Sequence, residues 1–355
     1  MIEYTLNSSA REITEAMSDG KKAKVFSMFF PENFTALIPE DMYDCPVADL
    51  SEKVKMPWGA PFISRDMARA ANLTNEIVEE KAWEFVPLWV ESSPDYIPDP
   101  DAGGKEQVCL IVPSNPEAGS KPAVIICPGG GYEILGPDNE GLNLAKKMAE
   151  NGYVAFVLLY RRKPDYYPAP QEDLALAAKY VKYNAEKYGV DKNTIMFMGS
   201  SAGGHLCASV AAYPDETDAA LIAELEKTDP EKAKKYREIP IKPDQLCLNY
   251  PVISFVKEAH EQSFQALTGG DESLRDKLSI ELHVDENYPK TFVWACEDDG
   301  LVPCSNAVRF GEALKKEGVP CRLRVYPQGD HGCGLGDGTS AAGWSDEMLS
   351  FFNGR

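Results

Sequence analysis

Ser201 stands in the stretch Gly199–Gly203, which matches the pattern Gly-x-Ser-x-Gly. An apolar run ends at Met198 and a helix-like pattern follows the stretch, so we predict a sharp strand-to-helix turn with Ser201 at its tip. A serine on such a turn exposes its hydroxyl as a nucleophile. Ser200 is in the wrong register, because no glycine stands two residues to either side of it. Taken alone, the pattern also fits an ordinary glycine-rich connection.

A carboxylate and a histidine follow later predicted strands. Three adjacent acids, 297–299, come directly after the apolar run that ends at Cys296, and His331 lies between Gly329 and Gly332 after the last predicted strand. A carboxylate can hold a histidine in the tautomer that accepts a proton from a serine, and it stabilises the charged form. The residues alone leave open which of the three acids has this role, and an acidic surface cluster also accounts for at least two of them.

A run of three glycines, Gly129–Gly131, follows the predicted strand at 121–127. Glycine lets the backbone approach closely, so its N–H groups can donate to the oxyanion of a tetrahedral intermediate. The N–H of Ala202, directly after the candidate nucleophile, is a second expected donor. A phosphate-binding loop would require Gly-Lys-Ser or Gly-Lys-Thr entering a helix, whereas Tyr132 and Glu133 follow here.

The chain has four histidines, and we assign the chemistry to His331 alone. His205 lies one helical turn after Ser201, so we predict that it has a structural hydrogen-bonding role. His260 and His283 have no catalytic surroundings that the sequence reveals.

The elements that would position these residues alternate between strands and helices. Continuous apolar strands in this order are typical of a mostly parallel sheet with helices on both faces, the α/β class. We predict about eight strands, at 83–91, 106–113, 121–127, 153–160, 194–198, 245–250, 291–296 and 321–326. Helices are predicted at about 139–151, 170–188 and 304–317. In such sheets the active site lies beyond the carboxyl ends of the strands.

The predicted organisation has two parts. Residues 1–82 form an N-terminal extension with one helix from Ser8 or Ser9 to Gly20 and another at 64–80. This extension is too hydrophobic for a disordered tail, so we expect it to pack on the core, as a cover or as a contact in a homo-oligomer. Residues 83–355 form the catalytic domain, with a charged helical insertion at about 215–238.

Composition limits the partners and the location. The 355 residues carry a net charge of −20, which disfavours nucleic acid and anionic membranes as partners. The nine cysteines lack Cys-x-x-Cys spacing and lie mostly in apolar runs, so we expect buried small hydrophobes and neither a metal nor a cofactor. No signal peptide and no membrane helix is apparent, so a cytoplasmic protein is expected.

From about residue 108 onward the sequence resembles α/β-hydrolases of the small esterase and acetyl-xylan-esterase-like group, which is related to feruloyl esterases and to the "lipase/esterase" hydrolases. The matching segments are Pro128–Tyr132, Tyr160–Arg161, Tyr167–Pro170 with Asp173, Gly199–His205, Tyr250–Ser254, Asp299–Pro303 and Gly329–Gly332. The order Ser, Asp, His is also that of the family.

The resemblance implies an α/β-hydrolase fold and named roles for several residues. Ser201 would be the nucleophile, Asp299 the acid and His331 the base, with Asp298 as the alternative acid. The amides at 130, 131 and 202 would form the oxyanion hole. One departure is Cys127–Pro128 before the glycine run, where hormone-sensitive-lipase-like relatives have His-Gly.

The predicted function is that of a serine carboxylesterase acting on short-chain esters, in the first place acetyl esters, of carbohydrates or similar small alcohols. Three tyrosines, Tyr132, Tyr166 and Tyr167, are candidates for stacking on a sugar ring. A serine peptidase or amidase of the same fold is the first alternative, and a non-enzymatic binding protein is the second. The substrate would be a small-molecule ester, such as an acetylated sugar or oligosaccharide.

Overall fold

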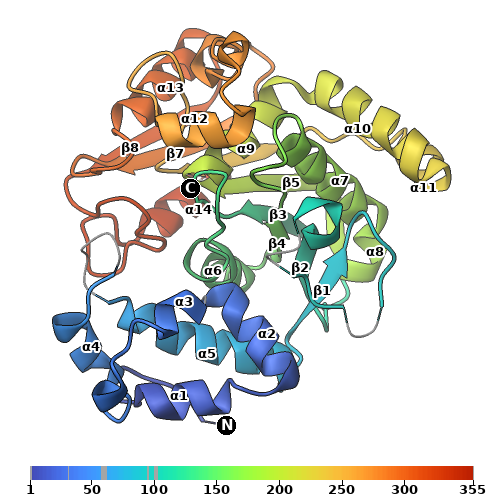
Figure 1. The fold of residues 1–355 in the computed structure, drawn as a ribbon. Coiled ribbons are helices and arrows are strands. Elements are labelled where there is room, and N and C mark those ends of the chain that lie inside the picture. Colours follow the sequence, from blue (N-terminus) through green and yellow to red (C-terminus); the bar gives the residue numbers. More distant parts are fainter. Residues whose placement is uncertain (1, 31, 57–61, 94–95, 100–102, 355) are drawn as a thin grey trace.

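An eight-stranded sheet forms the centre of the protein (Figure 1). The computed structural model describes residues 2–30, 32–56, 62–93, 96–99 and 103–354. The strands are β1 (Trp83–Pro87), β2 (Cys109–Pro113), β3 (Lys121–Cys127), β4 (Val154–Leu159), β5 (Val190–Ser200), β6 (Gln245–Asn249), β7 (Lys290–Cys296) and β8 (Cys321–Tyr326). Each of the eight predicted strands is therefore confirmed, with small differences in its limits.

The sheet is mostly parallel, as predicted. Its order is β1-β2-β4-β3-β5-β6-β7-β8, and only the β1–β2 and β2–β4 pairs are antiparallel. The central strands are apolar along their whole length because helices cover both faces. All six residues of β4 are buried, for example, as are the last six of β7. The carboxyl ends of β3, β5, β7 and β8 point to the same edge, which carries the candidate site residues.

Most helices that follow residue 83 flank this sheet. Helix α9 packs against β5 and β6 and also against α7, whereas α6 and α14 are joined by the Lys147–Asp346 ion pair. The helices are α6 (Asn143–Glu150), α7 (Ala169–Tyr183), α8 (Ala185–Tyr188), α9 (Ala202–Ala212), α10 (Pro214–Thr228), α11 (Pro230–Tyr236), α12 (Glu261–Thr268), α13 (Ser305–Lys316) and α14 (Trp344–Phe352). Short 3₁₀ turns occur at Glu40–Met42, Gly104–Gln107, Glu272–Leu274 and Ile280–Leu282.

Several helices differ from the prediction. The helix expected at 139–151 begins with a π-helical turn, Asp138–Leu142, in which the Leu142 amide donates to the Pro137 carbonyl at 2.8 Å. The charged insertion consists of two helices, because Asp229 caps α11 and Pro230 cannot continue α10. Helices α12 and α14 were not predicted.

The N-terminal extension forms a group of helices that lies on the side of the sheet where α6 is found (Figure 1). They are α1 (Ala10–Ala16), α2 (Gly20–Phe29), α3 (Glu32–Thr35), α4 (Val47–Lys53) and α5 (Ser64–Val78). The Ser9 hydroxyl accepts from the Glu12 amide and caps α1, as expected, but Gly20 begins α2 instead of ending α1. One continuous cluster of buried apolar residues joins these helices to the sheet.

Three charged side chains lie where α5 meets the π-helical turn. Arg69 Nη1 is 3.3 Å from Asp66 and 3.7 Å from Asp138. Burial, followed by the charge of Asp66, raises the pKa of Asp138 from 3.8 to about 6 despite the nearby guanidinium. The ionised Asp138 therefore destabilises the fold relative to the protonated form.

We expect Asp138→Asn to be more stable than the wild type at pH 8, by up to about 3 kcal/mol for a pKa difference of roughly two units. In the wild type, the protonated Asp138 contributes favourably to the free energy of unfolding. This contribution is complete below pH 3.8 and is lost as the pH rises through about 6. The two proteins should therefore have similar stability at pH 4. Urea unfolding at both pH values measures the difference, and a variant less stable at pH 8 would show that the Arg69–Asp138 attraction outweighs burial.

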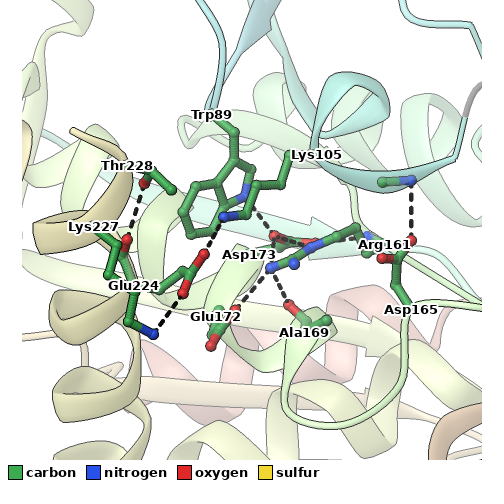
Figure 2. Close-up of polar contacts among 11 residues, drawn as sticks. Trp89, Lys105, Arg161, Asp165, Ala169, Glu172, Asp173, Glu224, Lys227 and Thr228 are labelled. Carbon is green, nitrogen blue, oxygen red and sulfur yellow. Dashed lines mark hydrogen bonds and ion pairs between the residues drawn. The ribbon is translucent and has the colours of Figure 1, made fainter.

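A second polar cluster ties the segment after β1 and the helical insertion to α7 (Figure 2). The buried Arg161 Nη2 lies 2.9 Å from Asp173 Oδ1, which also accepts from Trp89 Nε1 at 2.6 Å. Lys105 lies over the Trp89 ring and pairs with Glu224 of α10 at 2.5 Å. Arg161 and Asp173, which both belong to the segments that resemble the α/β-hydrolases, thus form a buried ion pair with a structural role.

The cysteines in apolar runs are buried, as the sequence predicts. All nine cysteines are free thiols, and the five in apolar runs are buried: Cys109, Cys127, Cys207, Cys247 and Cys296. Among the described residues, no group of three or more histidine, cysteine or acidic side chains is arranged to hold a metal ion.

Candidate active site

Ser201 occupies the sharp turn between β5 and α9. Its backbone has φ 52° and ψ −120°, a conformation that residues other than glycine rarely adopt. The glycines around it are required by close contacts: a Cβ on Gly199 would lie 2.2 Å from the Gly203 carbonyl oxygen, and a Cβ on Gly203 would lie 2.0 Å from that of Cys127. The turn is therefore strained, and it directs the serine hydroxyl away from the sheet.

Three side chains from the ends of three strands meet in one chain of hydrogen bonds. Ser201 Oγ lies 2.8 Å from His331 Nε2, and His331 Nδ1 lies 2.7 Å from Asp299 Oδ2. The Asp299 side chain is fully buried and that of His331 is 12% exposed. With Nδ1–H donating to the carboxylate, Nε2 is left as an acceptor for the serine proton. The structure thus brings together the three residues that the resemblance selects.

The two adjacent aspartates have different partners. Asp299 Oδ1 accepts from the amides of Leu301 and Val302 at 2.9 and 2.8 Å, which leaves Oδ2 for His331. Asp298 instead accepts from the backbone of the histidine loop, at 2.9 Å from the amides of both Gly329 and Asp330. Asp298 therefore ties the loop after β7 to the loop after β8 and does not contact the imidazole ring.

The expected oxyanion donors lie beside the serine. Gly130 and Gly131 line the same cavity as Ser201, and both have positive φ, 130° and 65°. Within the described part of the chain, neither amide donates a hydrogen bond, so both are available to a ligand. Ala202 is the first residue of α9 and is fully buried. The Gly129 amide is already used, because it donates to Glu140 Oε2 at 2.8 Å.

A cavity of about 390 Å³ opens above Ser201. Glycines form the wall next to the serine, Ile134 and Leu301 supply apolar surface, and polar side chains complete the lining. Its polar members besides Ser201 and His331 are Glu133, Asn139, Glu140, His260 and Gln262. The volume suits a small molecule.

None of the three candidate tyrosines lines this cavity. The prediction that Tyr132 stacks on a sugar is wrong, because its ring is completely buried and its hydroxyl lies 2.8 Å from His205 Nδ1. Tyr167 is half-buried, and its hydroxyl lies 3.3 Å from Glu216 of the helical insertion. Tyr166 is 42% exposed, and its ring packs beside Gly269. The structure therefore does not bring these tyrosines to Ser201.

Two other histidines, His205 and His260, lie in different surroundings. His205 is fully buried between Tyr132 and the Leu278 carbonyl, and burial lowers its pKa to about 4, which confirms a structural role. His260 does line the cavity, contrary to the sequence prediction, and its Nδ1 lies 2.7 Å from Ser263 Oγ. Burial, followed by the charge of His331, lowers the pKa of His260.

Sequence reasoning missed polar side chains that the segment after the glycine run brings into the cavity. Glu140 is nearly buried, and burial raises its pKa while hydrogen bonds from Tyr250 and Gly129 oppose the rise. Asn139 precedes it, and Glu133 accepts from Gln262 Nε2 at 2.5 Å. Glu133, Asn139 and Glu140 all lie within ten residues of the glycine run, which is the one signal that the sequence contained.

A nucleophile turn after β5, an acid after β7 and a histidine after β8 of a mostly parallel sheet define the α/β-hydrolase class. The profile of the BD-FAE family matches residues 110–314, more than half of the chain. The chain belongs to this BD-FAE family.

None of the described helices has the length and apolar character needed to cross a bilayer.

Two curated relatives are similar over much of this chain. Endo-1,4-beta-xylanase B of Butyrivibrio fibrisolvens is 29% identical over 87% of the chain and 45% of its own length. Acetylxylan esterase of Xylanibacter ruminicola is 28% identical over 66% of the chain and 45% of its own length. The chain thus spans a little under half the length of these relatives.

A solved structure is similar to this chain over nearly all of its own length. It is the acetyl ester-xyloside bifunctional hydrolase from Caldicellulosiruptor lactoaceticus, which is 33% identical with a TM-score of 0.64. The match covers 76% of this chain and 96% of that one.

Proposed function

We propose that the protein is a serine carboxylesterase that removes short acyl groups, in the first place acetyl, from carbohydrates or similar polyhydroxylated alcohols. Ser201 is the nucleophile, His331 the general base and acid, and Asp299 the carboxylate that orients the imidazole. The amides at 130, 131 and 202 stabilise the oxyanion.

The observation that carries the proposal is the unbroken contact from Asp299 through His331 to Ser201 at the floor of a cavity. Each of the two contacts is within 2.8 Å, so proton transfer needs no rearrangement. Membership in the BD-FAE family and the names of the relatives, an acetylxylan esterase and an acetyl ester-xyloside hydrolase among them, also support ester hydrolysis.

The reaction proceeds in two halves. Ser201 Oγ attacks the acyl carbon as its proton passes to His331 Nε2, and the resulting oxyanion accepts hydrogen bonds from the loop and turn amides. Collapse of this intermediate breaks the ester C–O bond, and His331 returns the proton to the departing alcohol. A water molecule then gives its proton to His331 and attacks the acyl-enzyme, which releases the carboxylic acid and restores Ser201.

The chemistry of the cavity supports the substrate class. Few apolar side chains line the cavity beside Ser201, which favours a short acyl group. Glu133, Gln262 and His260 add hydrogen-bonding side chains to the lining, where they suit hydroxyl groups of a sugar. A long-chain ester would need a larger apolar surface than Ile134 and Leu301 provide.

We expect kcat/KM to be highest for acetyl esters and to fall by roughly tenfold or more for octanoyl esters, since the lining offers a longer chain little apolar surface beyond Ile134 and Leu301. The measurement is a panel of p-nitrophenyl acetate, butyrate and octanoate, an acetylated xylo-oligosaccharide, and aminoacyl p-nitroanilides. Anilide cleavage faster than acetate cleavage would favour the peptidase alternative. No turnover of any compound would return the protein to the class of non-enzymatic binding proteins.

A further inference from the structure

The π-helical turn Asp138–Leu142 stands between the N-terminal helices and the active site. Each of its three polar side chains contacts a different part of the protein. Asp138 faces Arg69 of α5, Asn139 reaches the loop that carries His331, and Glu140 reaches the glycine loop. π-Helical turns occur frequently at functional sites, where they reorient side chains that a regular helix would direct elsewhere.

The first contact comes from α5. Arg69 Nη1 donates to Asn139 Oδ1 at 3.0 Å, and the Arg69 side chain is 23% exposed. Arg69 lies outside residues 110–314, the part that matches the BD-FAE family. The N-terminal extension therefore supplies a cation to a residue of the active-site wall.

The second contact reaches the catalytic loop. Asn139 Nδ2 donates to the Gly332 carbonyl at 2.8 Å, directly after His331. The carboxamide fits closely against Gly334, where a Cβ would lie 2.6 Å from Asn139 Oδ1. Since Gly332 and Gly334 both have positive φ and carry no side chain to anchor them, this loop depends on such external contacts for its position.

Arg69 determines which way the Asn139 amide faces. The amide must present its nitrogen to the Gly332 carbonyl, so its oxygen needs a donor on the other side. Arg69 is that donor. Without it, the amide loses the contact that favours this orientation, and the Gly332 carbonyl loses its fixed partner.

We propose that Arg69 is a positioning residue through which the N-terminal extension holds the His331 loop, by way of Asn139. The proposal rests on the catalytic role of His331 in the proposed function. Misplacement of a catalytic group by 1 Å can reduce turnover by about 10²-fold. Arg69 itself touches neither the cavity nor the reacting atoms, so we expect its main effect on kcat, through the position of the imidazole.

The kinetic test compares Arg69→Ala with Arg69→Lys and with Lys146→Ala. The last variant removes a different ion pair between α5 and the core, Lys146 with Glu76, which does not reach the active site. We expect Arg69→Ala to lower kcat roughly tenfold with KM within twofold, Arg69→Lys to recover part of the loss, and Lys146→Ala to retain wild-type kcat. An equal loss in Arg69→Ala and Lys146→Ala would overturn the proposal, as would an unchanged kcat in Arg69→Ala.

A double-mutant cycle locates the path of the effect. Asn139→Ala should lower kcat at least as much as Arg69→Ala, and the double variant should lose no more than Asn139→Ala alone. Fully multiplicative losses would mean that Arg69 does not act through Asn139. Thermal melting of each variant confirms that the comparison is made on folded protein.

A spectroscopic test separates this inference from the proposed function. With histidine-selective isotope labelling the protein should give four imidazole signals, and His331→Gln identifies that of His331. In Arg69→Ala we expect the His331 signal to shift or broaden while those of His205 and His283 stay in place. If the His331 signal did not move in Arg69→Ala, the positioning role would be refuted even in an active enzyme. If it moved, the role would be supported even if no ester were hydrolysed.

Discussion

Replacing Ser201 with alanine is expected to lower kcat for p-nitrophenyl acetate by roughly 10⁵- to 10⁶-fold, the loss typical of removing the nucleophile from such a triad. The hydroxyl is the only atom of this side chain that reaches His331, so its removal leaves the base without a proton to take. What remains over the uncatalysed reaction comes from substrate binding and the oxyanion donors. Initial rates over a range of substrate concentrations give kcat directly.

Ser200→Ala is the matched control for this prediction. Ser200 is also buried, but its Oγ lies 3.1 Å from Asn249 Nδ2 and does not contact His331. We expect this variant to retain kcat within about tenfold of the wild type, since a single buried hydrogen bond contributes about 1 kcal/mol. If Ser200→Ala were inactive and Ser201→Ala active, the nucleophile would be Ser200 and not Ser201.

The second large effect is expected at Asp299. In Asp299→Asn the amide nitrogen can face His331 Nδ1, which forces the ring into the tautomer that carries its proton on Nε2. That nitrogen then no longer accepts the serine proton, and kcat should fall by about 10⁴-fold. The oxygen of the new side chain can still accept from Leu301 and Val302, so the loop should keep its conformation.

Asp298→Asn tests the choice between the two neighbouring acids. The Asp298 carboxylate accepts from two backbone amides of the histidine loop, and asparagine retains one acceptor oxygen for them. We expect kcat to stay within about tenfold of the wild type and thermal stability to fall modestly. If Asp298→Asn were inactive and Asp299→Asn active, the assignment of the acid would have to be reversed.

The central strands of the sheet could be predicted because they are buried on both faces. A strand such as β4, Val154–Leu159, has no polar residue and is bounded by turn residues, so its limits are evident in the sequence. Candidate site residues after these strands follow from topology alone, since parallel strands deliver their carboxyl ends to one edge. The contact between Ser201, His331 and Asp299 could be anticipated for this reason, although their separation along the chain is large.

The cavity wall could not be predicted in the same way. Tyr132 is buried and has a φ of 61°, a backbone conformation that no periodic pattern encodes. Asn139 and Glu140 reach the site because the chain forms a π-helical turn where a regular helix was expected. His260 enters the cavity from a loop before α12, a helix too short to be recognised from its apolar spacing.

The N-terminal extension illustrates a further limit. The sequence indicated that residues 1–82 are hydrophobic enough to pack on the core, and one continuous apolar cluster joins these helices to the sheet. A hydrogen bond between Arg69 and Asn139, which are seventy residues apart, links them to the active-site wall. Long-range polar pairs of this kind leave no local pattern in a sequence.

Labelling with a fluorophosphonate, followed by mass spectrometry of the proteolytic peptides, tests the central claim most directly. The reagent reacts fastest with a serine that an adjacent base has activated. We predict one adduct per chain, located on Ser201, which is retained in Ser200→Ala and greatly slowed in Asp299→Asn. An adduct on any other residue, or hydrolysis of acetyl esters by a protein whose Ser201 stays unmodified, would contradict the account.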